Sequence, residues 1–214
     1  MDKATFPDII RDYYREGVNI MELGVFMDRK NVTYHAGVKP LLHNRPEEVQ
    51  KIRVLTKQMF SGVAFDVGEN SARTRSVNPG AINIHTLDET CVVFPSLTDY
   101  VGAYRFLPTD DIPTITAERM AYLRCPNILT AVSLSLWLRH PRIVEAIRHE
   151  FRKKRGKNSK EMNFTFLSVI PVPEGMLQPH IVGRALEIDN KIVEAHKELN
   201  AMVDELRAIS VEYT

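Results

Sequence analysis

The chain has 214 residues, of which 44% are hydrophobic and 26% are charged, a composition typical of a folded globular protein rather than a disordered one. The 28 basic and 27 acidic residues give a net charge of +1, so the overall charge does not point to nucleic acid or to a membrane surface. Cys91 and Cys125 lack the spacing of a disulfide framework or a zinc site. We therefore expect no metal and no cofactor. No apolar signal segment is present and no stretch approaches ~20 apolar residues, so we expect a cytoplasmic protein that enters no membrane.

The first half of the chain predicts one helix followed by short strands. Thr5 is a capping residue ahead of Pro7 and Asp8, which predicts a helix over 7–16 that ends at Gly17. Residues 18–42 are ambiguous, because their apolar pattern fits either a strand or the first helix of a helix-turn-helix. Short apolar runs between Gly, Asn, Pro and Ser residues then predict strands at 62–67, 81–85 and 90–94.

The second half predicts two helices, a strand, a proline-containing linker and one long helix. The two helices are expected at 127–139 and 141–154, and Pro141 suits the first turn of the second. A strand is predicted at 163–169 and the linker at 170–175. The predicted fold class is α+β, with a β-rich globular domain over 1–173, including the helix within 1–17 whose role is unclear, and a coiled-coil helix over 174–214.

The long helix carries an apolar seam in which spacings of four and three residues alternate without a break. This 3.5-residue period over about four heptads predicts a coiled coil, because it keeps one stripe facing a single partner helix. We call these nine residues the apolar seam: Ile181, Ala185, Ile188, Ile192, Ala195, Leu199, Met202, Leu206 and Ile209. The alternative is an amphipathic helix folded back on its own domain.

Residues 152–160 form a basic run with six Lys or Arg residues and no acid. Together with Arg139, Arg142, Arg148 and His149 on the preceding predicted helix, this run could contact phosphates, since basic residues that neutralise phosphates release condensed counterions. The alternative is that the run complements the dipole of its own helix and stays solvated.

The order of these features resembles the end of a target recognition domain in the specificity subunit of type I restriction-modification enzymes. The resemblance rests on Leu136-Trp137-Leu138-Arg139-His140-Pro141-Arg142-Ile143, a glycine-bearing polar loop at 156–159, the linker Val169-Ile170-Pro171-Val172-Pro173-Glu174, Gln178, Ile181-Val182 and the long helix. Upstream, Asp88–Phe94, 113–124, 22–27 and 31–34 match the family pattern less closely. The resemblance covers roughly residues 18–213.

The sequence also departs from the family pattern. Glu174-Gly175 replaces the second proline of the linker, Gln178 stands late, and Asn31 replaces the usual glycine of the first loop. The helix within 7–16 has no clear counterpart. A whole specificity subunit has two recognition domains and two helices, whereas this sequence has one of each and so resembles a half-subunit.

The resemblance implies a non-catalytic protein that binds double-stranded DNA and docks a DNA adenine methyltransferase subunit, with a restriction or translocase subunit as a further partner. A half-subunit would homodimerise through the long helix and read a split palindrome. The direction of pairing stays open. Arg184 and Asp189 suit a parallel pair, but Lys191 would face His196 and Glu198 would face Val203.

Base reading requires side chains with paired donors and acceptors, and three polar loops supply them. The DNA-binding candidates are Arg29, Lys30, Asn31, Thr33, Tyr34 and His35 in the first loop; Asn70, Arg73, Arg75 and Asn78 in the second; and Arg155, Lys157, Asn158 and Lys160 in the basic loop.

No catalytic residues are predicted. Asp110, Asp111 and Glu118 lack the pattern of a nuclease metal site, and neither a phosphate-binding glycine loop nor a nucleophile elbow is present. The main rival interpretation is a dimeric transcription regulator with a helix-turn-helix over 18–42. A structural or viral assembly protein with a coiled-coil tail is the third.

Overall fold

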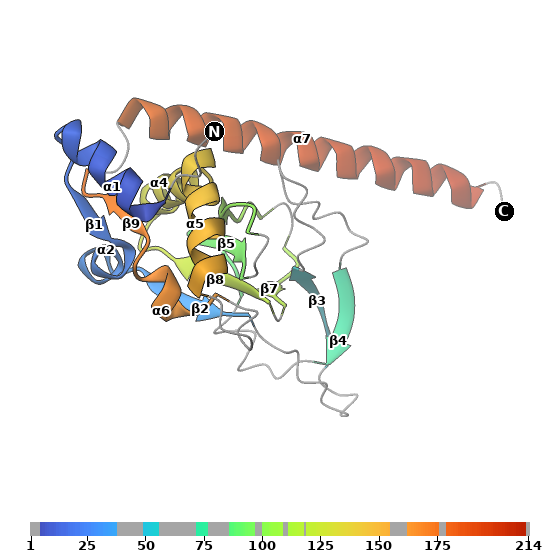
Figure 1. The fold of residues 1–214 in the computed structure, drawn as a ribbon. Helices are drawn as coiled ribbons and strands as arrows, with labels where there is room; N and C mark the ends of the chain where they lie inside the picture. Colours follow the sequence, from blue (N-terminus) through green and yellow to red (C-terminus); the bar gives the residue numbers. More distant parts are fainter. Residues whose placement is uncertain are drawn as a thin grey trace.

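The structure is a computed structural model that describes residues 5–37, 49–55, 72–76, 86–96, 100–108, 111–117, 119–154, 162–175 and 179–212. Helices and strands are mixed along the chain, which confirms the α+β class (Figure 1). The helices are α1 (Phe6–Arg15), α2 (Leu23–Lys30), α4 (Ile128–Leu138), α5 (Pro141–Lys154), α6 (Phe164–Leu167) and α7 (Pro179–Glu212). The strands are β1 (Ile20–Glu22), β2 (Thr33–Ala36), β3 (Val49–Leu55), β4 (Ala72–Ser76), β5 (Cys91–Pro95), β6 (Tyr104–Arg105), β7 (Thr114–Thr116), β8 (Met120–Arg124) and β9 (Pro171–Pro173).

Helix α1 begins and ends as its sequence predicts. The Thr5 hydroxyl accepts a hydrogen bond from the Asp8 backbone N–H, and the Asp8 carboxylate accepts one from the Thr5 backbone N–H at 3.1 Å. Gly17 follows the helix with φ +73, a conformation that glycine adopts without strain. Phe6 and Ile9 are buried in the main core, so α1 is an integral part of the domain even though the family resemblance offers no counterpart for it.

Helices α4 and α5 confirm the two predictions for 127–139 and 141–154. The Asn127 side chain caps α4 by accepting a hydrogen bond from the Thr130 backbone N–H at 2.9 Å. Pro141 is the first residue of α5, where its missing N–H costs no helical hydrogen bond. Both boundaries depend on local chemistry, which is why the sequence locates them well.

The strand predicted at 163–169 is wrong, because the short helix α6 occupies that segment. The Asn163 side chain accepts a hydrogen bond from the Phe166 backbone N–H at 3.0 Å and so starts a helical turn. The proline linker that follows is itself a strand, β9, which pairs antiparallel with β1. Prolines are tolerated there because the two-stranded pair leaves one side of β9 unpaired.

Residues 20–36 form a strand, a helix and a second strand. Helix α2 has no side-chain cap, but the N–H groups of Leu23 and Gly24 donate to the carbonyls of Ile170 and Ser168, each at 2.8 Å. A Cβ added at Gly24 would lie 3.0 Å from the Ser168 Cβ, so the glycine permits this close approach. The helix-turn-helix interpretation is wrong, because β2 lies where a recognition helix would begin.

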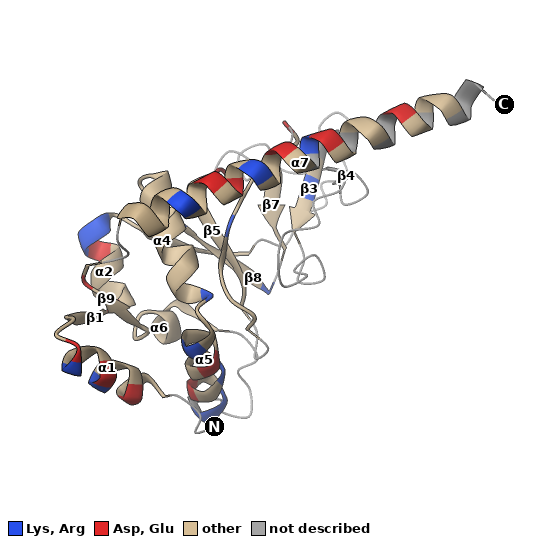
Figure 2. Cartoon of the chain, turned by 90° about the horizontal axis from the view of Figure 1, so that it is seen from above, with Lys and Arg blue, Asp and Glu red and all other residues tan. Residues whose placement is uncertain are grey.

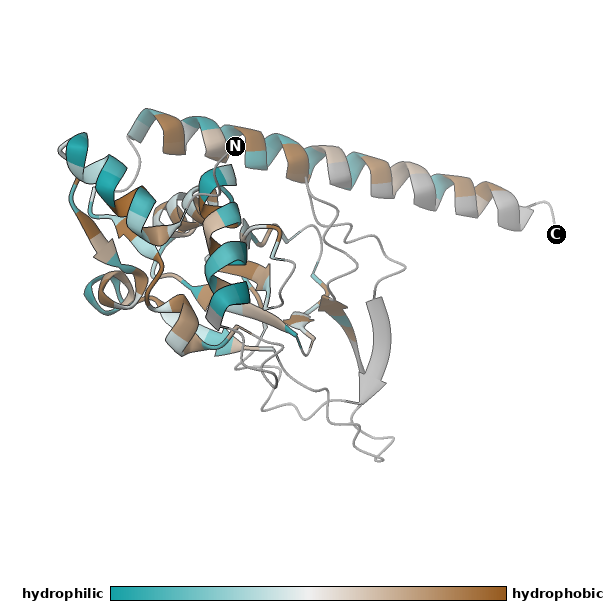
Figure 3. Cartoon of the chain, viewed as in Figure 1, coloured by the Kyte–Doolittle hydropathy of each residue, from teal (hydrophilic) through white to brown (hydrophobic). Residues whose placement is uncertain are grey.

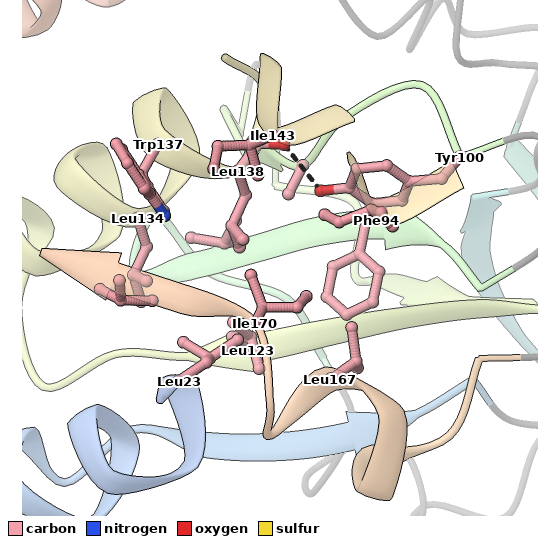
Figure 4. Close-up of a cluster of buried hydrophobic side chains, with 14 of the residues drawn as sticks. Leu23, Phe94, Tyr100, Leu123, Leu134, Trp137, Leu138, Ile143, Leu167 and Ile170 are labelled. Carbon is pink, nitrogen blue, oxygen red and sulfur yellow. Dashed lines mark hydrogen bonds between the residues drawn. The ribbon is translucent and has the colours of Figure 1, made fainter. Parts of the chain in front are cut away.

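A four-stranded antiparallel sheet in the order β2-β8-β5-β6 forms the centre of the domain. Successive residues of its inner strands are buried on opposite faces, as the two-residue period of a strand requires. On one face, Phe94 and Leu123 pack with α4, α5 and α6 (Figure 4). On the other face, Val93 and Tyr122 pack with Leu55 of β3.

A second sheet has the order β4-β3-β7, with β3 antiparallel to β4 and parallel to β7. The strand predicted at 90–94 is confirmed as β5. The strands predicted at 62–67 and 81–85 lie outside the described residues.

Candidate functional site

The first loop of DNA-binding candidates spans the end of α2 and the strand β2. Asn31 joins them in the left-handed conformation, with φ 54, which asparagine adopts more easily than most residues. Asparagine can therefore stand where the resembling family has glycine. The turn separates Arg29 and Lys30, on the last turn of α2, from Thr33 and His35 on β2.

The two basic residues of this loop lie beside the start of α7. Arg29 Nη1 donates to Glu174 Oε1 at 3.0 Å, in an ion pair that is exposed on both sides. Lys30 lines a cavity of about 480 Å³ together with Phe26 of α2, Leu129 of α4 and Val182 of α7. Arg29 and Lys30 are thus placed at the junction between the domain and the long helix.

The β2 candidates divide between the two faces of the central sheet. The Thr33 hydroxyl and His35 Nε2 are 3.0 Å apart, and the His35 ring stacks on Tyr122 with ring centres 4.7 Å apart. Tyr34 points to the other face, where its ring lies 5.7 Å from that of Phe164. The strand therefore presents Thr33 and His35 together, and Tyr34 apart from them.

The second and third loops are mostly beyond what the structure describes. Arg73 and Arg75 lie on β4, in register with Ile52 and Gln50 of β3. Five further DNA-binding candidates lie outside the described residues together with Asn70, so their role stays a prediction: Asn78, Arg155, Lys157, Asn158 and Lys160.

Three of the basic residues predicted to extend the phosphate surface around α5 make contacts within the chain. Arg142 forms a close ion pair with Asp12 of α1, and Arg148 Nε donates to the Tyr100 carbonyl. The Arg139 guanidinium lies 5.8 Å from the centre of the Tyr104 ring. The phosphate surface at this helix stays a prediction. Its end within the described residues has the exposed Arg152 and Lys153, of which Lys153 lies 3.7 Å from the Glu150 carboxylate.

Helix α7 both packs against the domain and leaves its apolar seam exposed. Val182 is buried, and α7 contacts α4. Seam residues in both halves of the helix nevertheless remain exposed. For example, 50% of the surface of Ile188 and 66% of that of Leu206 is accessible to solvent. Apolar bands recur along α7, including the part that extends beyond the domain (Figure 3). The fold-back alternative thus holds for part of the helix, since Ala185 and Ile192 are half-buried, but the residues that the structure describes leave most of the seam exposed.

An ion pair that the sequence did not reveal joins α7 to the central sheet. Arg105 of β6 donates from Nε and Nη2 to Asp189 Oδ2, each at 2.9 Å. Asp189, which suits a parallel pair with Arg184 of a second copy, is thus already bound within its own chain. A charge on a helix that carries a coiled-coil repeat does not reveal a partner 84 residues away.

Titratable groups near the sheet offer no activated nucleophile. Burial raises the pKa of the Cys91 thiol to about 11 and that of the Cys125 thiol to about 12, so both stay protonated and unreactive near neutral pH. Burial alone would raise the pKa of Asp88. Hydrogen bonds from Thr90, together with the positive charge of Arg124, outweigh the effect of burial and hold that pKa below its ordinary value.

The described residues offer neither a metal site nor a membrane-crossing helix. These residues contain no cluster of three His, Cys, Asp or Glu side chains that could hold a metal ion. Within the same residues, no helix combines the length and the apolar character needed to cross a membrane.

No model of a known protein family matches the sequence, and no curated protein is similar to it in sequence. Among solved structures, the fold is similar to a chain described under "Structural basis underlying complex assembly and conformational transition of the type I R-M system". The TM-score is 0.48 at 13% sequence identity, and the match covers 95% of this chain and 49% of that chain. The present chain therefore spans about half the length of the chain that it matches.

Proposed function

We propose that this chain is a non-catalytic DNA-recognition subunit that directs an adenine methyltransferase to a split DNA site, as a half-subunit that pairs with a second copy of itself. The observation that carries the proposal is the exposed apolar seam of α7, which follows a domain that resembles a type I recognition domain in the order of its sequence motifs. A 3.5-residue apolar repeat that is half exposed calls for a partner helix. The globular part, residues 1–173, would read DNA, and residues 174–214 would form the assembly arm.

The charges that flank the seam favour antiparallel pairing of two copies. Four charged residues each precede a seam residue directly and therefore line one flank of the seam. They are basic in the half of the helix near the domain, Arg184 and Lys191, and acidic in the far half, Glu198 and Glu205. All four side chains are exposed, and charged residues are distributed along the helix (Figure 2). In an antiparallel pair this flank meets its own copy, so that Arg184 faces Glu205 and Lys191 faces Glu198.

The same register matches the seam. It places Ile188 against Leu199 and sets the small Ala195 against the large Ile192, so that no layer brings two alanines together. A parallel pair would offer Arg184 only Asp189, which is held by Arg105. Two recognition domains would then lie at opposite ends of the paired helices, an arrangement suited to a DNA site with two separated halves.

The DNA-facing surface in this proposal includes the β2 candidates Thr33 and His35, the β4 candidates Arg73 and Arg75, and the basic run. The exposed Arg152 and Lys153 at the end of α5 lead into that run. Arg29 and Lys30 are assigned to the junction with α7 and not to base reading, because Arg29 is paired with Glu174. The methyltransferase subunit would dock on the arm, as the resemblance implies, and a restriction subunit would join through it.

Co-expression with a methyltransferase tests this proposal. The chain is produced with an adenine methyltransferase subunit of a type I restriction-modification system, and methylated adenines are mapped on plasmid DNA of mixed sequence. The account predicts methylation confined to one split, two-fold symmetric motif. A variant with Leu199→Asp in the seam should lose that pattern, whereas Glu187→Ala on an exposed position outside the seam should keep it. Methylation without sequence preference, or failure to bind the methyltransferase, would contradict the proposal.

A further inference from the structure

Two of the contacts that hold α7 against the domain differ in character. Val182 is a buried apolar contact near the first turn. About two turns later, Asp189 accepts both hydrogen bonds of the Arg105 guanidinium. The side chains of this pair are only 7% and 16% exposed. Beyond it, α7 extends past the domain (Figure 1).

Arg105 is itself held by α4 and by the turn before β5. Its backbone N–H donates to the Ser135 hydroxyl of α4 at 3.1 Å, and that hydroxyl donates to the Ala103 carbonyl at 3.2 Å. Its Nη1 donates to the Glu89 carbonyl, in the turn before β5, at 3.3 Å. A guanidinium is a rigid planar donor, so an Arg side chain fixed in this way defines the position and the direction of the carboxylate that it binds.

An apolar contact alone tolerates sliding and rotation, whereas the ion pair is directional. The two contacts, at Val182 and Asp189, lie about 10 Å apart along the helix, and about 35 Å of helix follow Asp189. A change of about 10° in the helix direction would therefore move its far end by about 6 Å, given this length. Small changes at the ion pair are amplified at the seam.

We propose that the Arg105–Asp189 ion pair sets the direction in which α7 leaves the domain, and thereby sets the distance between the two recognition domains of the pair. The second clause rests on the proposed function. The first is a property of a single chain and is testable without DNA or a second subunit. Arg105 and Asp189 are positioning residues, since neither is assigned a contact with DNA.

Distance measurement by electron spin resonance tests the proposal on the full chain. Spin labels are attached after Glu145→Cys on α5 and Ala208→Cys on α7, two exposed positions outside the seam and its charged flank. The native Cys91 and Cys125 are buried and do not compete for the label. Labelled chain is mixed with excess unlabelled chain, so that only distances within one molecule contribute. The chain with native Arg105 should give one narrow distance distribution.

Arg105→Met should replace that distribution with a broad one, whereas Arg29→Met, which breaks the exposed pair with Glu174, should leave it narrow. If Arg105→Met prevents folding, Arg105→Met combined with Asp189→Leu replaces the buried pair with apolar groups that the fold tolerates. This double variant should also give a broad distribution. An unchanged narrow distribution in either folded variant would overturn the proposal.

A readout on DNA separates this inference from the proposed function. The native dimer should bind sites with one spacer length between the two halves, and the Arg105→Met dimer should accept several. If no split site is ever bound but the distance distribution still broadens, the proposed function fails and the role of the ion pair stands. If a split site is bound with equal spacer selectivity by both proteins, the ion pair does not set the spacing.

Discussion

Truncation of one seam residue should weaken self-association of the chain by a predictable amount. Leu206 is 66% exposed in the single chain, and full burial of a leucine side chain contributes about 1.5–3 kcal/mol. Burial of the remaining two thirds against a partner would therefore contribute about 1–2 kcal/mol per copy on the same scale. Leu206→Ala removes most of this contribution twice, because each copy of the pair carries the substitution.

The expected loss is thus about 2–4 kcal/mol per dimer, which corresponds to a rise of about 30- to 1000-fold in the dissociation constant. Sedimentation equilibrium measures that constant directly over a dilution series. Lys197→Ala is the matched control, because Lys197 is exposed on α7 outside the seam. Its dissociation constant should stay within about threefold of the unsubstituted chain, since surface substitutions of this kind rarely exceed ~0.5 kcal/mol.

The reasoning fails if Leu206→Ala dimerises as tightly as the control, because the exposed seam would then not be the dimer contact. It also fails if the unsubstituted chain remains monomeric at every concentration tested. A loss of helix content in Leu206→Ala, measured by circular dichroism, is not expected, since alanine is the best helix former.

Three further predictions concern the domain itself. Tyr100→Phe should lower the free energy of unfolding by about 1–2 kcal/mol, as measured by urea denaturation. The buried Tyr100 hydroxyl donates to the Leu138 carbonyl at 2.9 Å (Figure 4), and the variant leaves that acceptor unpaired. An unchanged denaturation midpoint would contradict this prediction. Asn163→Ala should cost about 1 kcal/mol through loss of the α6 cap, and rescue by Asp but not by Leu at that position would identify capping as the cause. Asp88 has a lowered pKa in the folded chain, so its stabilisation is present above its ordinary pKa and is lost as the pH falls through the lowered one. Asp88→Asn should therefore lower the free energy of unfolding at neutral pH and lose this effect in acid below the lowered pKa, and an equal effect under both conditions would refute the assignment.

Local chemistry explains which elements could be predicted. Thr5 with Asp8, Asn127 and Pro141 each act on their own helix within a few residues, and the structure shows all three helices where the sequence placed them. The same logic applied to Asn163 would have revealed α6. The apolar run that follows it outweighed the capping signal and suggested a strand.

Contacts between distant segments could not be predicted from the sequence. Two prolines argue against a strand over β9 when the segment is considered alone. The segment is nevertheless a strand because it pairs with β1, which lies about 150 residues earlier in the chain. Asp189 lies within a coiled-coil repeat, and only the fold brings Arg105 to it. The exposure of Leu206 likewise required the structure, because the heptad pattern predicts a partner without telling whether the domain itself provides it.

Selection of binding sites from random DNA tests the central claim most directly. The purified chain is incubated with a library of duplexes at physiological salt, and the bound fraction is sequenced after repeated rounds. The account predicts one enriched motif made of two short halves in inverted orientation, separated by a spacer of fixed length. Leu206→Ala at the same concentration should lose the split motif. Enrichment of a single continuous motif by both proteins, or of no motif by either, would contradict the claim that two copies joined through α7 read a bipartite site.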